Sequence, residues 1–384
     1  MKKSMTPRQR LVEALNHREP DRVPIDMGTA VSSIHIDAYR RLKKYLGFDG
    51  AGPRIIDMMQ QVVAVEESVL QRFRVDTRQL FIKSAKPWQK LPDGNYVNEW
   101  GVKFKKPENS HYYDMYEHPL ADAGVEDLQH FSWPDPDDPR RTRGLREQAG
   151  ELFHNTEYAL VLNGFGECMF GLPSWLRGHV QFYMDLISNR EFVAALLDRL
   201  LDIEMRLAKN VLEAAGEYIQ VVRVSDDLGT EQGPIISPSL YRELIKPRQK
   251  KLYQYIKSNT SAKLLLHSCG SVYQLIPDFI EIGVDALNPV QVSARGMDTG
   301  KLKKEFGENI TFWGGGCDTQ KVLPMGTVEQ VREEVGQRLR DLAPGGGFVF
   351  TPVHNIQYDV QPEKICAVYD TAFELGDYPV GKKQ

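Results

Sequence analysis

IQVVRVSDD at residues 219–227 and KLLLHSCG at residues 263–270 are two apolar runs separated by a helical pattern at residues 238–258. Both runs are apolar over most of their length, as expected for strands of a parallel sheet that are buried on both faces. Parallel neighbours need a crossover connection between them, and the helical pattern supplies one. This stretch therefore predicts an α/β fold with parallel strands.

The same alternation extends along the whole chain and gives eight strand candidates. They are VPIDMG (23–28), RQLFIK (78–83), ALVLNG (159–164), IQVVRVSDD (219–227), KLLLHSCG (263–270), DALNPVQ (285–291), ITFWGGG (310–316) and GFVFTPVHN (347–355). Helical patterns occur at residues 191–215, 238–258, 271–283, 327–342 and 362–375. We predict a single (β/α)8 TIM barrel over residues 1–384. A doubly wound open sheet has the same order of elements and is therefore an alternative fold.

Residues 84–140 interrupt the alternation of apolar runs and helical patterns. LPDGNYVNEWGVKFKK alternates around Asp93 and Gly94 in the manner of a hairpin, and an irregular acidic and aromatic run follows it. We interpret the segment as an insertion after the second strand that folds over one end of the barrel. A lid or a substrate wall is the expected role.

Composition restricts the class of protein. The chain has 384 residues, of which 41% are hydrophobic and 26% charged, as in ordinary globular proteins. Its net charge of −4 argues against a nucleic-acid surface, which needs a basic excess. No apolar run approaches the roughly 20 residues of a membrane span, and the amphipathic start lacks the apolar segment of a signal peptide. We expect a cytoplasmic protein.

The carboxyl ends of the strands form the mouth of such a barrel, where active sites lie. Side chains alternate along a strand, so His267 and Cys269 are expected to project together. The seventh strand ends near Cys317 and the eighth near His354. Zinc prefers thiolate and imidazole, and a catalytic zinc site uses three protein ligands with an open fourth position. We predict that His267, Cys269 and Cys317 bind zinc.

Other interpretations of these residues stay open. A His-x-Cys pair is a weak signal by itself, because free cysteine is often buried for packing alone. We assign His354 to substrate binding, with a fourth metal ligand or a solvent-facing loop residue as alternatives. The remaining cysteines, Cys168 and Cys366, are interpreted as structural, since a disulfide framework is not expected in a cytosolic chain.

Carboxylates also stand at predicted strand ends. Asp226 and Asp227 close the fourth strand, and Glu167 follows the third. Carboxylates at a barrel mouth are candidates for orienting a metal ligand or moving a proton, so we predict catalytic roles for all three. The alternative is that one of the aspartates caps a helix or pairs with Arg223.

Aromatic and sulfur side chains follow the third strand. Phe165, Met169 and Trp175 are predicted to line a substrate pocket, although a cluster at this spacing is more often part of a core. The insertion adds further aromatic side chains that are placed to close over the pocket, namely Trp100, Tyr112, Tyr113 and Tyr116. No dinucleotide fingerprint or P-loop is present.

Five blocks of sequence carry a family resemblance. They are RQRLVEALNHREPDRVPIDMG, DDLGTEQGPIISPSLYRELIKPRQKKL, LLLHSCGSVYQLIPDFIEIGVDALNPVQ, WGGGCDTQKVLPMGTVEQV and HNIQYDVQPEKI. These blocks resemble the uroporphyrinogen decarboxylase-like superfamily, from about residue 6 to about residue 378. The resemblance implies a (β/α)8 barrel with one of two chemistries. These are metal-free decarboxylation of uroporphyrinogen and zinc-dependent methyl transfer to or from a corrinoid protein.

The details of the resemblance favour the methyltransferases. Decarboxylases carry an arginine-rich block similar to MRQAGRY, and this chain has DMGTAVSSIHIDAYR in the corresponding region. The methyltransferases carry a His-x-Cys pair that His267 and Cys269 match, followed by a later cysteine. In the coenzyme M branch that cysteine falls nearer His354, whereas this chain has Cys317. The resemblance therefore does not decide the identity of the third and fourth metal ligands.

The resemblance implies a corrinoid-dependent methyltransferase that acts on a small methylated substrate, such as a methoxyaromatic compound. This chain lacks the Asp-x-His-x-x-Gly signature of cobalamin-binding proteins, so the corrinoid is expected on a separate partner protein. The direction of transfer stays open, with a demethylase component preferred. Whether the chain forms a homodimer also stays open.

Two alternatives to methyl transfer remain. The first is a decarboxylase that acts on a tetrapyrrole or another acid, with Asp26 and Asp226 as its carboxylates. The second is a non-catalytic protein that binds a corrinoid or porphyrinoid. Turnover of uroporphyrinogen by metal-free protein would indicate the first, and stoichiometric tetrapyrrole binding without turnover the second.

Overall fold

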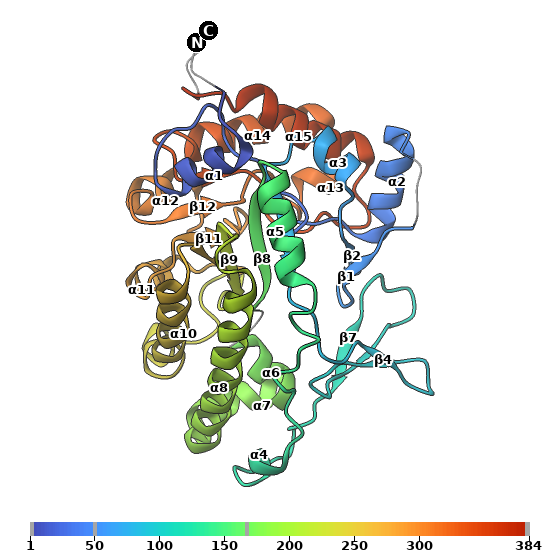
Figure 1. The fold of residues 1–384 in the computed structure, drawn as a ribbon, viewed down its shortest axis with the longest axis vertical. Coiled ribbons are helices and arrows are strands. Elements are labelled where there is room, and N and C mark those ends of the chain that lie inside the picture. Colours follow the sequence, from blue (N-terminus) through green and yellow to red (C-terminus); the bar gives the residue numbers. More distant parts are fainter. Residues whose placement is uncertain (1–3, 49–51, 166–168, 381–384) are drawn as a thin grey trace.

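The computed structural model describes residues 4–48, 52–165 and 169–380. Its main sheet contains seven parallel strands in the order β13-β12-β11-β10-β9-β8-β3 (Figure 1). The strands are β3 (Thr77–Phe81), β8 (Ala159–Phe165), β9 (Val221–Ser225), β10 (Lys263–His267), β11 (Ala286–Asn288), β12 (Thr311–Trp313) and β13 (Phe348–Val349). Each overlaps one of the predicted apolar runs, so these seven strand predictions are confirmed.

The segment around Ile25 fills the eighth position of the barrel. Ile25 forms a parallel bridge with Phe350, just beyond β13. On its other side, the Asp76 amide donates to the Ile25 carbonyl at 2.8 Å, just before β3. The predicted strand at residues 23–28 is thus reduced to a single bridge, but it joins the two edges of the sheet. The architecture is therefore a closed (β/α)8 barrel and not an open doubly wound sheet.

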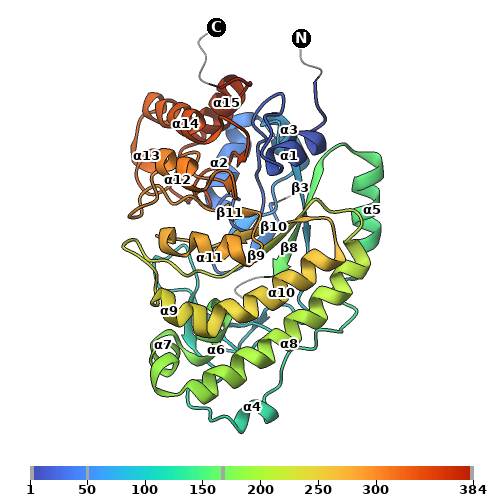
Figure 2. The same ribbon diagram turned by 90° about the vertical axis from the view of Figure 1, so that its left-hand side faces the viewer.

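Helices cover the outer face of this barrel (Figure 2). The longer ones are α5 (Leu145–Asn155), α8 (Arg190–Ala215), α10 (Lys246–Asn259), α14 (Val328–Leu342) and α15 (Pro362–Leu375). The other, shorter helices of the described chain are α1 (Pro7–Leu15), α2 (Ile36–Leu46), α3 (Glu67–Arg72), α4 (Asp127–His130), α6 (Gly171–Arg177), α7 (His179–Ser188), α9 (Pro238–Leu240), α11 (Ile276–Glu281), α12 (Thr299–Phe306) and α13 (Val322–Met325). A π-helical turn at Tyr241–Ile245 precedes α10, and a 3-10 turn at Tyr273–Leu275 precedes α11. Among the described residues, no helix combines the length and apolar character that a membrane span requires.

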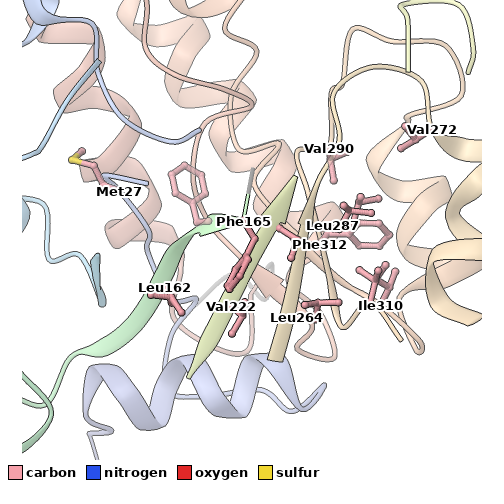
Figure 3. Close-up of a cluster of buried hydrophobic side chains, with 14 of the residues drawn as sticks. Met27, Leu162, Phe165, Val222, Leu264, Val272, Leu287, Val290, Ile310 and Phe312 are labelled. Atoms are coloured by element: carbon pink, nitrogen blue, oxygen red, sulfur yellow. The ribbon is translucent and has the colours of Figure 1, made fainter. Parts of the chain in front are cut away.

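One face of each strand packs against these helices. Val222 on β9 lies in register with Leu162 on β8 and Leu264 on β10, and all three side chains are fully buried (Figure 3). They belong to the main apolar cluster, which also contains side chains of α8, α10 and α14. Burying one such side chain contributes about 1.5–3 kcal/mol. This outer layer holds the helices on the barrel.

The other face of the strands points into the barrel. Val161, Val221 and Leu265 form a second buried cluster, and Leu11 and Leu15 of α1 belong to the same cluster. Because α1 packs on the apolar layer at the amino-terminal half of the strands, that end of the barrel is filled. The opposite, carboxyl-terminal end is left for polar groups and ligands.

The insertion after β3 forms a small sheet of its own. Its strands are β4 (Gln89–Lys90), β5 (Tyr96–Val97), β6 (Lys103–Lys105) and β7 (Asp114–Glu117), which pair antiparallel in chain order. A separate two-stranded ribbon, β1 (Ile55–Asp57) and β2 (Val62–Val63), lies near it (Figure 1). Phe104 of β6 is fully buried in a third apolar cluster with Leu176 of α6 and Leu196 of α8. The predicted insertion after the second strand is thus confirmed, and it packs beside the helices that follow β8.

Candidate metal centre

His267 is the last residue of β10 and faces the barrel interior. Leu265, two residues earlier, belongs to the inner cluster, and alternation places His267 on the same face. Its Nδ1 lies 2.5 Å from Oδ1 of Asn288, its neighbour in register on β11. Asn288 donates from Nδ2 to the Trp313 carbonyl at 2.9 Å, which leaves Oδ1 as the acceptor for His267. The proton of His267 is therefore on Nδ1, and Nε2 keeps a free lone pair.

Cys269 lies two residues beyond the end of β10. Its Sγ is 3.4 Å from Nε2 of His267, and its amide donates to Oδ1 of Asp227 at 2.8 Å. Gly270 follows with a φ of +84°, and a Cβ at this position would lie 2.4 Å from the carbonyl carbon of Gly229. Only glycine accommodates this backbone approach. The Cys-Gly order therefore lets the loop turn sharply while the thiol stays beside the imidazole.

His354, in the loop after β13, completes a group of three. One ligand atom each from His267, Cys269 and His354 lies within 4.8 Å of the other two. Burial lowers the pKa of His267 to about 3 and the pKa of His354 to about 4, and the neighbouring imidazole also lowers the latter. Both imidazoles are therefore neutral near pH 7 and offer lone pairs. A thiol and two neutral imidazoles are a donor set that suits zinc.

A cavity of about 500 Å³ lies beside this group. Cys269 and His354 contribute to its wall together with Tyr112, Gln291, Thr319, Gln320, Pro324, Val353, Gln357, Tyr358 and Asp359. This volume is in the range of small-molecule sites. None of the described residues that line the cavity is a lysine or an arginine. The site therefore offers a candidate metal centre beside a cavity whose described lining carries no lysine or arginine.

Asp226 is placed away from this cavity wall. It is 1% exposed, and its carboxylate accepts hydrogen bonds from the amides of Met169 at 3.0 Å and Phe170 at 2.7 Å, and from Gln249 at 2.8 Å. Burial raises its pKa to about 6, although these hydrogen bonds act in the opposite direction. The carboxylate accepts the amides of Met169 and Phe170 just before α6, so its geometry favours positioning of the start of α6 over proton transfer.

Asp227 lies next to the candidate ligands. Its Oδ1 is 3.7 Å from Nε2 of His267, and the same oxygen accepts the Cys269 amide. Its side chain is 45% exposed, so it can reach a bound ligand as well as hold the Cys269 loop. The third predicted carboxylate, Glu167, lies outside the described residues, as does Cys168.

The predicted substrate residues at and after the end of β8 are not among the residues that line the cavity. Phe165 and Met169 are fully buried in the main apolar cluster, and Figure 3 shows Phe165 among the core side chains. Trp175 packs against the cluster that joins the insertion to α6 and α8. His354 is the one member of the predicted substrate set that contributes to the cavity wall. The structure places the other three among packed apolar side chains.

Cys317 is likewise not brought to His267 and Cys269. Its side chain is fully buried, and its Sγ donates to Oε2 of Glu334 on α14 at 3.4 Å. Burial and the adjacent carboxylate raise the pKa of Cys317 well above its usual range. Among the described residues, His354 and not Cys317 completes the group around His267 and Cys269.

Several residues of the site were not predicted. Asn288 stands at the end of a predicted strand, DALNPVQ, so the strand-end argument applied to His267 could also have found it. Gln291, Gln357 and Tyr358 line the cavity from loops, where no periodic pattern indicates the direction of a side chain. Tyr112 was predicted only as one of several aromatic residues in the insertion.

Fold and site together define a (β/α)8-barrel protein with a candidate thiolate–imidazole metal centre at the carboxyl end of its strands. The chain belongs to the uroporphyrinogen decarboxylase (URO-D) family, which matches residues 6–375. This confirms the family resemblance, and the chain is accordingly an enzyme of the URO-D-like type.

Two curated relatives and one solved structure are similar to this chain. A uroporphyrinogen decarboxylase from Alkalilimnicola ehrlichii is 23% identical over 97% of this chain and 95% of its own length. The methylcobamide:CoM methyltransferase MtbA of Methanosarcina acetivorans is 29% identical over 51% of this chain and 55% of its own length. A methyltransferase from Methanosarcina mazei superposes with a TM-score of 0.65 at 18% identity, covering 96% of this chain and 99% of the other. At that identity the last match shows the fold alone.

Proposed function

We propose that this protein is a zinc-dependent methyltransferase that moves a methyl group between a small methylated compound and a corrinoid carried by a separate protein. The observation that carries the proposal is the convergence of His267, Cys269 and His354 on one point beside a cavity. The similarity to a methylcobamide methyltransferase supports the same chemistry. The preferred direction is removal of the methyl group from the small compound.

The side chains fit a zinc ion in three respects. Asn288 holds Nδ1 of His267 as a donor, so that Nε2 faces Cys269 with its lone pair. Both imidazoles are neutral, and two of the three side chains, Cys269 and His354, line the cavity, so an ion held there would be accessible to a ligand from it. When bound there, zinc supplies a Lewis acid for the heteroatom that carries the methyl group, or holds an acceptor thiol as its thiolate.

The chain's own residues provide the enclosure. Tyr112 comes from the insertion and Tyr358 from the loop after β13, and together they give the cavity an aromatic wall. The Tyr112 hydroxyl donates to Oε1 of Gln357, which fixes the insertion against that loop. An aromatic wall suits a flat or apolar methyl donor, and a methoxyaromatic compound is therefore our first candidate. Asp227 accepts the Cys269 amide, and this hydrogen bond holds the Cys269 loop in place while substrate and product exchange in the cavity.

The test combines this protein with cob(I)alamin and a panel of methoxyaromatics, methylamines, betaines and methyl thiols. Formation of methylcobalamin is followed by absorbance. We expect transfer with at least one compound of the panel, loss of transfer in Cys269→Ser, and retention in Cys366→Ser, whose cysteine lies buried in α15. No transfer from any compound, together with rapid demethylation of methylcobalamin by a thiol, would reverse the assigned direction.

The alternative function is decarboxylation, which the near-full-length match to a decarboxylase favours. The geometry gives it less support. Asp26 is fully buried and accepts hydrogen bonds from Thr77 at 2.6 Å, Ser32 at 2.9 Å and Trp313 at 3.0 Å. The described cavity wall also has no arginine or lysine for the carboxylates of a tetrapyrrole. Decarboxylation of uroporphyrinogen by metal-free protein would replace the methyltransferase proposal.

A further inference from the structure

A second group of metal-binding side chains lies outside the centre described above. His35 and Asp37 stand at the start of α2, and His111 comes from the insertion, between β6 and β7. One ligand atom from each of the three lies within 4.8 Å of the other two. The group therefore joins a barrel helix to the inserted sheet, two segments that are far apart in the chain.

Both imidazoles converge on a single carboxylate oxygen. Oδ2 of Asp37 is 3.7 Å from Nδ1 of His35 and 3.4 Å from Nδ1 of His111. Two ligand atoms bound to zinc at tetrahedral angles lie about 3.4 Å apart, because each metal–ligand bond is about 2.0–2.1 Å long. The other oxygen, Oδ1, lies 3.4 Å from a guanidinium nitrogen of Arg40, which orients the carboxylate. The three atoms need only small movements to surround one ion.

The hydrogen bonds of His35 select the tautomer that a metal requires. Nε2 lies 3.4 Å from the carbonyl oxygen of His111, and Nδ1 accepts the amide of Asp37 at 3.2 Å. With the proton on Nε2, the lone pair is on Nδ1, the atom that faces the carboxylate. A metal-bound histidine characteristically donates its other N–H to a carbonyl in this manner. The Asp37 amide contact at 3.2 Å is what places the lone pair on Nδ1, and a bound ion would replace this contact.

The surroundings hold the rings in place. His35 is 2% exposed, whereas the side chains of Asp37 and His111 are 38% and 39% exposed and leave room for water. The His111 ring stacks on Tyr358 with centroids 3.7 Å apart and an interplanar angle of 13°. Tyr358 lines the cavity, and the His35 amide donates to the Ile356 carbonyl at 2.8 Å in the same loop. The group thus lies directly behind the cavity wall.

We propose that His35, Asp37 and His111 form a second site for a divalent transition-metal ion, with zinc as the ion to test first. Two imidazoles and one carboxylate, with the remaining positions open to water, suit such an ion. The ion fastens the insertion to α2 and holds Tyr358 and Tyr112 in the wall of the cavity. This role is structural, and it stands whether or not the centre at His267 performs methyl transfer.

Zinc content tests the proposal. After dialysis against zinc and removal of loosely bound ions, we expect about two zinc ions per wild-type chain and about one in His111→Gln, in Asp37→Asn and in Cys269→Ser. His111 is 39% exposed, so His111→Gln is expected to fold normally. The matched control is His130→Gln, which changes an exposed histidine of the same insertion and should leave the zinc content unchanged. Cobalt(II) in the second site should give a spectrum without a thiolate charge-transfer band.

A second readout follows the insertion itself. Lys105 and Lys106 are exposed and lie shortly before His111, so cleavage by trypsin between them reports local opening at the end of β6. Added zinc should slow this cleavage at least several-fold in wild type and in Cys269→Ser, but not in His111→Gln. Equal zinc content in wild type and His111→Gln would overturn the second site and would identify the group as an ordinary histidine–aspartate contact. Loss of zinc in His111→Gln with none lost in Cys269→Ser would instead overturn the proposed function.

Discussion

The Oδ1 atom of Asn288 lies 2.5 Å from Nδ1 of His267, while Nδ2 of the same amide donates to the Trp313 carbonyl. This relationship links three neighbouring strands, β10, β11 and β12, through one side chain. Because the amide can satisfy both partners in only one orientation, it determines which imidazole nitrogen is free. The tautomer of the candidate ligand is therefore set by the barrel sheet.

Replacing Asn288 tests this coupling. We expect Asn288→Ala to weaken zinc binding about 10–100-fold, because removal of a hydrogen-bond partner of a metal-bound histidine typically has this effect. Competition with a chromogenic chelator, performed in the His111→Gln background, measures this centre alone. Asn309→Ala, which changes an exposed asparagine, is the control. Unchanged affinity in Asn288→Ala would show that the tautomer is set in another way.

The buried carboxyl of Asp226 predicts a pH dependence of stability. Its pKa rises from 3.8 to about 6 on folding, so between these values the folded protein holds a proton that the unfolded chain has released. The free energy of unfolding should therefore fall as the pH rises from about 4 to about 6, by about 3 kcal/mol from this group. Asp226→Asn should remove this part of the pH dependence. Urea denaturation at several pH values provides the comparison, and parallel curves for the two proteins would refute the assignment.

Closure of the barrel depends on Asp76. This residue is fully buried and pairs with Arg10 at 2.5 Å and with Arg22 at 2.8 Å, and it also accepts the Ile25 amide at 2.8 Å. We expect Asp76→Ala to cost about 3–5 kcal/mol, because it leaves the buried Arg22 guanidinium without its carboxylate partner and leaves Arg10 with Asp21 alone. Denaturant unfolding measures this loss. Asp93→Ala, at an exposed turn of the insertion, should stay close to wild type, and equal stability of the two variants would contradict the account.

The fold was predictable because its signals are local. Buried parallel strands are continuous apolar runs, and seven of the eight predicted runs overlap observed strands. The segment at Ile25 pairs only through one bridge, and its place between the sheet edges depends on Asp76, a contact that sequence periodicity does not contain. The apolar pattern therefore predicts the strands of the barrel, but the contact that closes the barrel is visible only in the structure.

The candidate site was only partly predictable, for a related reason. His267 and Cys269 lie together as strand alternation predicts, because Cys269 is still close to the end of β10. At Cys317 the same rule no longer applies, since β12 ends at Trp313 and Gly314 and Gly315 follow with φ values of +94° and +82°. The backbone turns there, and the thiol points to Glu334 on α14.

The identity of the third ligand is the most direct test of the account. Elemental analysis should show about one zinc ion fewer than wild type in Cys269→Ser and in His354→Gln, and no change in Cys317→Ser. In the cobalt(II)-substituted protein, the thiolate charge-transfer band should persist in Cys317→Ser and disappear in Cys269→Ser. Loss of the metal in Cys317→Ser with full retention in His354→Gln would contradict the centre formed by His267, Cys269 and His354.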